Sequence, residues 1–76
     1  MNTLEKVQAI ITQQLKVPAE KITEDARLVE DLGADSANVM VLIMDLEDEF
    51  NMTVDDAAIN TLRTVGDVVK YIEENQ

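Results

Sequence analysis

The chain has 76 residues, a formal net charge of −10 at pH 7, and neither Cys nor His. This length predicts one domain, residues 1–76, with a single small core, and the composition excludes disulfides and the Cys and His ligand sets of structural zinc sites. With six Lys and Arg residues against sixteen Asp and Glu residues, the chain lacks the positive charge that binding to nucleic acid requires.

The first predicted helix runs from Thr3 to about Leu15, where one apolar stripe is formed by Leu4, Val7, Ile11 and Leu15. Asn2 is its predicted N-cap, Glu5 stands at the capping-box position, and Pro18 discourages continuation of the helix. The chain opens on no signal-peptide pattern and contains no apolar stretch of membrane-spanning length. Because a secreted domain of this size would more often be cross-linked by Cys, we expect a cytoplasmic protein with no membrane span.

A long connection follows, from Lys16 to Asp35. Its expected buried anchors are Ile22, Ala26, Leu28, Val29 and Leu32. A loop of this length in a small domain usually has a function or packing of its own. It ends in the sequence DLGADS, residues 31–36, in which Gly33 allows a sharp turn before Asp35 caps the next helix.

The second predicted helix extends to about Phe50 and contains six consecutive apolar residues, 39–44. It is therefore apolar around most of its circumference, and we expect one face to meet a partner or to line a cavity.

A short helical turn is predicted near Asp56 to Asn60, with three side chains directed toward the core, Val54, Ile59 and Leu62. Thr64 and Asp67 form a capping-box pattern at the start of the last helix, whose apolar positions are Val65, Val68, Val69 and Ile72. No strand-like alternation occurs. The expected fold class is all-α, a four-helix bundle of three main helices plus one short helix.

Ser36 stands at a helix start within a strongly acidic segment. No Lys or Arg occurs between Arg27 and Arg63, so the Ser36 hydroxyl lies in a field that repels anions and attracts basic proteins. A serine near a helix start most often only satisfies a backbone donor. The chain offers this serine no His base and no GxSxG motif, so we expect any chemistry at its hydroxyl to depend on an external enzyme.

The surroundings of Ser36 resemble those in acyl carrier proteins, specifically the discrete carriers of dissociated fatty acid synthesis. The resemblance rests on EDLGADS, on an apolar helix ending in LEDEF and on the final TVGDVVKYI, and it covers nearly the whole chain. It implies that a phosphopantetheinyl transferase, using Mg²⁺, attaches 4′-phosphopantetheine from coenzyme A to Ser36. The thiol of this arm would then carry acyl groups as thioesters, and Asp35 would support the site by orienting the metal or the partner. The resemblance thus implies a monomeric, non-catalytic carrier in fatty acid biosynthesis.

The resemblance also implies a surface on which basic enzymes of fatty acid synthesis dock. Its predicted members are Met40, Val41, Met44, Glu47, Asp48, Asp55 and Asp56. Electrostatic docking of this kind accelerates encounter more than it adds affinity. For the acidic members, the alternative is a solvated face, which is what most charge runs are.

For the acyl chain, the resemblance implies a cavity between helices. The residues expected to line it are Leu28, Val29, Leu42, Ile43, Leu46, Phe50, Val54, Ile59, Leu62, Val68 and Ile72, and Leu32 is expected to pack beneath the site. The alternative for this set is an ordinary core.

The chain departs from the common pattern directly after Ser36. Fatty acid carriers continue with a larger apolar residue, then an acid, then another acid three positions later, whereas this chain has Ala37, Asn38 and Val41. Ala57 and Ala58 similarly reduce the charge of the short helix. These differences favour, as a second hypothesis, a specialised carrier for a polyketide, lipid-modifying or other secondary pathway with dedicated partners.

Three other classes of protein fit the sequence less well. A calcium sensor would need a twelve-residue ligand loop around a central glycine, and neither Gly33 nor Gly66 stands in one. A hydrolase using Ser36 would lack a histidine base. A structural helper that only binds basic proteins would function without Ser36.

Overall fold

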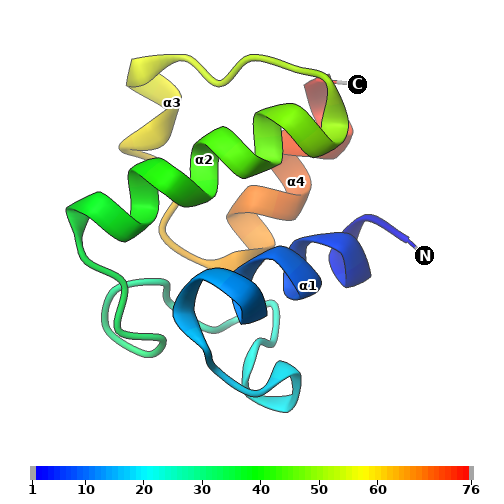
Figure 1. Ribbon diagram of the computed structural model, residues 1–76. Coiled ribbons are helices and arrows are strands. Elements are labelled where there is room, and N and C mark those ends of the chain that lie inside the picture. Colours follow the sequence, from blue (N-terminus) through cyan, green and yellow to red (C-terminus); the bar gives the residue numbers. More distant parts are fainter. Residues whose placement is uncertain (1, 76) are drawn as a thin grey trace.

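The computed structural model describes residues 2–75, which form α-helices and one 3₁₀ turn. The elements are α1 (Thr3–Leu15), η1 (Ala19–Lys21), α2 (Ser36–Phe50), α3 (Asp56–Ile59) and α4 (Val65–Asn75), as Figure 1 shows. Bridge pairing in this part of the chain is confined to one isolated antiparallel contact between Arg27 and Thr64. The predicted all-α fold of three main helices and one short helix is confirmed, and α3 ends one residue earlier than expected.

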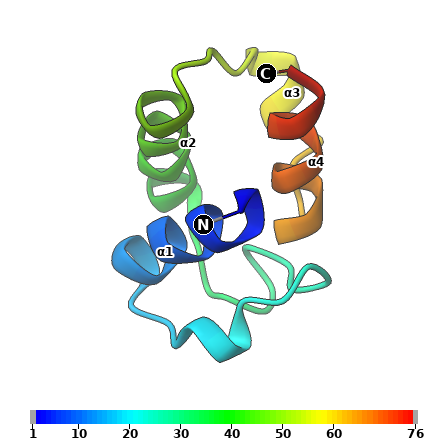
Figure 2. The same cartoon turned by 90° about the vertical axis from the view of Figure 1, so that its right-hand side faces the viewer.

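The helices are arranged around α1, which packs against both α2 and α4. Figure 2 shows α2 and α4 on opposite sides of the molecule, with α1 below and between them. The connection between α1 and α2 is joined to the residue before Thr64 and to the first turn of α4 by three backbone hydrogen bonds, one of which runs from Gly66 N–H to the carbonyl of Glu24 at 2.8 Å. Leu28 N–H donates to the carbonyl of Arg63 at 2.9 Å, and Val65 N–H donates to the carbonyl of Ala26 at 3.0 Å. These bonds fix the long connection to the helical bundle.

The predicted caps of α1 and α4 are present. The Asn2 side chain accepts a hydrogen bond from Glu5 N–H at 2.8 Å, and Glu5 accepts one in return from Asn2 N–H at 3.1 Å. At α4, the Thr64 hydroxyl accepts from Asp67 N–H at 3.0 Å, while the Asp67 carboxylate accepts from Thr64 N–H at 3.1 Å. Each pair satisfies backbone donors that the first turn of a helix leaves without a partner.

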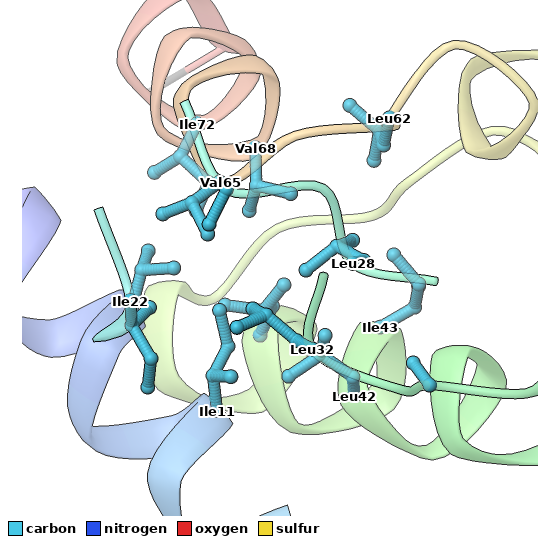
Figure 3. Packing of buried hydrophobic residues seen from close by; sticks show 14 of the residues in the cluster. Ile11, Ile22, Leu28, Leu32, Leu42, Ile43, Leu62, Val65, Val68 and Ile72 are labelled. Carbon is cyan, nitrogen blue, oxygen red and sulfur yellow. The ribbon is translucent and has the colours of Figure 1, made fainter. Parts of the chain in front are cut away.

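One continuous apolar core joins α1, α2 and α4 with the connecting segments. Figure 3 shows part of it, with Ile11 of α1, Leu42 of α2 and Ile72 of α4 among the labelled side chains. Four of the five anchors predicted in the long connection are buried there, namely Ile22, Ala26, Leu28 and Leu32. Burial of such side chains is the main source of stability in a bundle without disulfides or metal.

The prediction that Val29 is a buried anchor was wrong, because its side chain is 55% exposed. The backbone winds into a turn here, with Asp31 N–H and Leu32 N–H both donating to the carbonyl of Arg27 at 3.0 Å. In a helical turn, residues four apart share a face, whereas the next residue along the chain points elsewhere. Leu28 and Leu32 therefore face the core together and Val29 faces outward.

Within the described part of the chain, every helix is too short or too polar to span a membrane.

Candidate functional site

Ser36 is the first residue of α2, and its side chain is exposed. The helix is capped by the preceding residue: the Asp35 carboxylate accepts a hydrogen bond from Asn38 N–H at 2.8 Å. The Asn38 side-chain oxygen accepts one in return from Asp35 N–H at 3.3 Å, which completes a capping box. The predicted cap at Asp35 is confirmed. Because Asp35 satisfies the helix terminus, the Ser36 hydroxyl is available to an approaching molecule.

The turn that delivers Ser36 to the surface depends on Gly33. Its φ is +77°, in the left-handed region that side chains disfavour, as its sequence position predicts. Gly33 N–H donates to the carbonyl of Val29 at 3.1 Å, and Ala34 N–H donates to that of Leu28 at 2.9 Å. Leu32 and Ala34 on either side are buried, so the loop is anchored by two apolar side chains and turns between them.

A cleft of about 440 Å³ adjoins Ser36. It lies between the first turns of α2, the end of α3, the long connection and the segment before α4. Its lining residues are Leu28, Val29, Glu30, Ser36, Val39, Met40, Ile59, Asn60, Leu62 and Arg63. The walls are mostly apolar and the charged side chains are Glu30 and Arg63. The volume is within the range of sites that hold small organic ligands.

The structure brings together only part of the set predicted to line an acyl cavity. Leu28, Val29, Ile59 and Leu62 line the cleft. The other seven pack in the core instead, namely Leu42, Ile43, Leu46, Phe50, Val54, Val68 and Ile72. Figure 3 shows Leu42, Ile43, Val68 and Ile72 among the buried side chains between the helices, so for these seven residues the structure has the ordinary core that was the alternative to a cavity.

Several residues of the cleft were not predicted from the sequence. Val39 is three residues after Ser36 on α2, and that helical spacing is a signal that could have placed both on one face. Glu30 comes from the long connection, and Asn60 and Arg63 come from the link between α3 and α4. Their proximity follows from the pairing of the long connection with the segment before α4, which no local pattern reveals.

The acidic loop before Ser36 contains a small ion-pair network. The Arg27 guanidinium lies 3.5 Å from the carboxylate of Glu30 and 3.2 Å from that of Asp31, and all three side chains are exposed. The side-chain hydrogen bond from Arg27, assisted by one from its backbone N–H at 2.8 Å, lowers the pKa of Asp31. The same side-chain contact raises the pKa of Arg27. The Arg27 guanidinium is thus paired with carboxylates of its own loop.

The predicted docking residues occupy an exposed stretch of α2 and the start of α3. Met40, Val41 and Met44 are 49%, 43% and 59% exposed, which is unusual for large apolar side chains on one helix. Asp48, Asp55 and Asp56 are also exposed. Glu47 differs, because it is half-buried and its carboxylate accepts a hydrogen bond from Val54 N–H at 2.7 Å. It helps to hold the link between α2 and α3.

The described residues provide an acceptor hydroxyl without the groups that would activate it. The sequence contains no His, and among residues 2–75 no group of three or more Asp or Glu side chains is arranged to hold a metal ion. An exposed serine of this kind is a poor nucleophile by itself. The arrangement can therefore accept a covalent group from an enzyme that supplies the base.

Comparisons with known proteins agree with this arrangement. The family model described as "Phosphopantetheine attachment site" matches residues 5–72. The chain is 49% identical over 76 residues to an acyl carrier protein of Helicobacter pylori, covering 100% of this chain and 97% of that protein. It is 49% identical over 69 residues to an acyl carrier protein of Thermotoga maritima, covering 91% of this chain and 85% of that one. A solved acyl carrier protein structure from Enterococcus faecalis, 35% identical, superposes with a TM-score of 0.85 over 100% of both chains.

Proposed function

The chain belongs to the acyl carrier protein family, and we propose that it carries intermediates of fatty acid synthesis as thioesters on a 4′-phosphopantetheine arm attached to Ser36. The observation that carries this proposal is the exposed Ser36 hydroxyl beside a mostly apolar cleft, at a helix start already capped by Asp35. We further propose that residues 1–76 act as one carrier domain in the cytoplasm.

The residues around Ser36 fit a phosphopantetheine group. The hydroxyl is open to solvent, so a phosphodiester can form there without disturbing the helix cap. The adjoining cleft offers Val39, Ile59 and Leu62 as apolar contacts for an extended arm or a short acyl chain. When bound, the group supplies the terminal thiol that this Cys-free chain lacks.

The loading of Ser36 requires a phosphopantetheinyl transferase as partner. The Ser36 oxygen forms the new bond to phosphorus, its proton passes to a base on the transferase, and the nucleotide portion of coenzyme A leaves. No His is present in the chain to take that proton. Asp35 is exposed immediately before Ser36, which suits it to orient the Mg²⁺ or the basic surface of the transferase while it caps α2.

The docking surface that we propose combines apolar and acidic contacts. Met40, Val41 and Met44 offer exposed apolar area on α2, and Asp48, Asp55 and Asp56 add negative charge at its C-terminal end and on α3. Basic enzymes of fatty acid synthesis would be attracted by these acids and would bury the apolar side chains. Raising the salt concentration should weaken such an association.

A specialised carrier is the second candidate, favoured by a specific observation on α2. The two positions at which common fatty acid carriers are acidic hold a neutral capping residue, Asn38, and an exposed apolar residue, Val41. This exchange of charge for apolar surface suits a dedicated partner with an apolar groove.

Reconstitution with purified bacterial fatty acid synthesis enzymes separates the two candidates. The phosphopantetheinylated protein is incubated with malonyl-coenzyme A, acetyl-coenzyme A and NADPH, and the acyl chain on the protein is followed by intact mass. Successive two-carbon additions are expected, and Ser36→Ala is the control without an arm. If the protein accepts the malonyl group but its acyl chain is never elongated, the result would contradict the fatty acid role and favour the specialised carrier.

A further inference from the structure

Arg63 is the one positively charged side chain among the described residues that line the cleft beside Ser36. The cleft contains one negative side chain, Glu30, whose carboxylate is already 3.5 Å from the guanidinium of Arg27. Within residues 2–75, no carboxylate forms an ion pair with Arg63. An uncommitted guanidinium therefore shares a cleft with an exposed hydroxyl.

The backbone of Arg63 is fixed on both sides, which determines where its side chain begins. Its N–H donates to the Asp67 carboxylate and to the carbonyl of Thr61, each at 3.1 Å. Its carbonyl accepts from Leu28 N–H at 2.9 Å. The carboxylate of Asp67 accepts hydrogen bonds from the backbone N–H groups of Arg63 and Thr64. The guanidinium stays exposed at the cleft.

We propose that Arg63 binds the phosphodiester of the arm, an inference that rests on the proposed attachment at Ser36. A phosphodiester on Ser36 adds a negative charge directly after Asp35, in a chain whose net charge is already −10. This repulsion destabilises the modified protein unless a cation is near. A guanidinium suits phosphate oxygens because it donates two parallel hydrogen bonds, and the apolar walls of the cleft reduce competition from water.

The consequence concerns the position of the arm. With its phosphate held by Arg63, the first part of the arm lies against Val39 and Ile59 in the cleft and is not extended into solvent. A partner that draws the arm out must break this contact. Arg63 is therefore a positioning residue for the arm and takes no part in the chemistry of the thioester.

The test compares apo and phosphopantetheinylated protein, each with Arg63 and with Arg63→Gln. Intact mass first verifies loading, and thermal unfolding at low salt is then measured for all four forms. We expect Arg63→Gln to lower the Tm of the modified form by about 2 to 4 °C more than that of the apo form, the scale of one partly exposed ion pair in a small domain. A merely structural role of Arg63 would lower both equally.

Two matched variants and one spectroscopic signal complete the design. Arg63→Lys retains the charge and should therefore keep most of the stability that Arg63 gives to the modified form relative to the apo form. Lys70→Gln removes a charge on α4 outside the cleft and should lower the Tm of both forms equally. The ³¹P resonance of the arm should shift in Arg63→Gln and stay in place in Lys70→Gln. Equal effects on both forms together with an unmoved ³¹P resonance would overturn the inference alone. If the protein gains no mass at Ser36 on incubation with the transferase, both this inference and the proposed function are overturned.

Discussion

Asp35 and Asn38 cap α2 reciprocally: each backbone N–H donates to the side-chain oxygen of the other residue, at 3.3 Å and 2.8 Å. Asn38 stands where common fatty acid carriers have an acid. Its side-chain oxygen accepts the hydrogen bond from Asp35 N–H, as a carboxylate oxygen would, without adding a charge. The helix start is thus preserved while the surface beside Ser36 is less negative.

Restoring charge on α2 should strengthen recognition by a generic basic transferase. The double change Asn38→Asp and Val41→Glu adds two negative charges, and the Asp oxygen can still accept the bond from Asp35 N–H. We expect kcat/KM for loading of Ser36 to rise by roughly tenfold at low salt, because steering acts on the encounter rate. The paired control is the single variant Val41→Gln, which retains Asn38 and adds polarity without charge. Equal rates for the charged and neutral variants, or a gain that persists at high salt, would count against electrostatic docking.

Gly33→Ala should destabilise the turn before Ser36. Apart from Gly33 and its two neighbours in the chain, no residue comes within 4 Å of the position that a Cβ would take, so the cost is one of backbone conformation at φ +77°. We expect a loss of about 1 kcal/mol in the free energy of unfolding, measured in urea. Gly33→Asn should lose less, because Asn enters the left-handed region more readily than Ala. If both variants were as stable as the parent protein, the turn would not depend on the conformational freedom of Gly33.

Asp67→Ala should lower stability in a pH-dependent manner. Hydrogen bonds from the backbone N–H of Thr64, and then from that of Arg63, hold the pKa of Asp67 below its ordinary value of 3.8. A carboxyl whose pKa is lowered in the folded state stabilises the fold above the unfolded-state value, and this contribution is lost as the pH falls through the folded-state pKa.

The loss on Asp67→Ala should therefore be about 1 kcal/mol at neutral pH and should shrink once the pH falls below 3.8. Urea unfolding of both proteins at neutral and acid pH measures it. Glu73→Ala, an exposed change on the same helix, is the control and should show a small, pH-independent difference. A constant loss at both pH values would show that the Asp67 charge has no part in the cap.

Salt and Mg²⁺ should stabilise the protein. The net charge is −10, and the ion pairs found within residues 2–75 are those of Arg27 with Glu30 and Asp31, so most carboxylates repel one another without compensation. We expect the Tm to rise by roughly 5 °C, about 1 kcal/mol for a domain of this size, with MgCl₂ more effective than NaCl at equal ionic strength. Calorimetry that showed the same Tm throughout would contradict marginal stability caused by self-repulsion.

Local features of the fold were predictable from the sequence because their partners lie close along the chain. The caps formed by Asn2 with Glu5, by Asp35, and by Thr64 with Asp67 each act over three residues. The apolar stripes likewise follow from helical spacing. The fold class, the bounds of α1 and α2 and, to within one residue, those of α3 could therefore be inferred, whereas the end of α4 and the 3₁₀ turn Ala19–Lys21 were not predicted.

Features that depend on an unrecognised turn or on distant contacts were not predicted. Val29 is an apolar residue beside the buried Leu28, and the local turn in which Asp31 N–H and Leu32 N–H donate to the carbonyl of Arg27 directs it outward. The cleft beside Ser36 contains Arg63 because the backbone of Leu28 pairs with that of Arg63, 35 positions further on. The division of the apolar residues between core and cleft is decided by the same tertiary pairing.

The central claim is that Ser36 is the attachment point of the arm, and intact mass tests it most directly. The apo protein and its Ser36→Ala variant are weighed before and after incubation with coenzyme A, Mg²⁺ and a broad-specificity phosphopantetheinyl transferase. We predict that the parent protein gains the mass of one phosphopantetheine group and that Ser36→Ala gains nothing. A parent protein of unchanged mass, or a variant that is modified equally, would contradict the account.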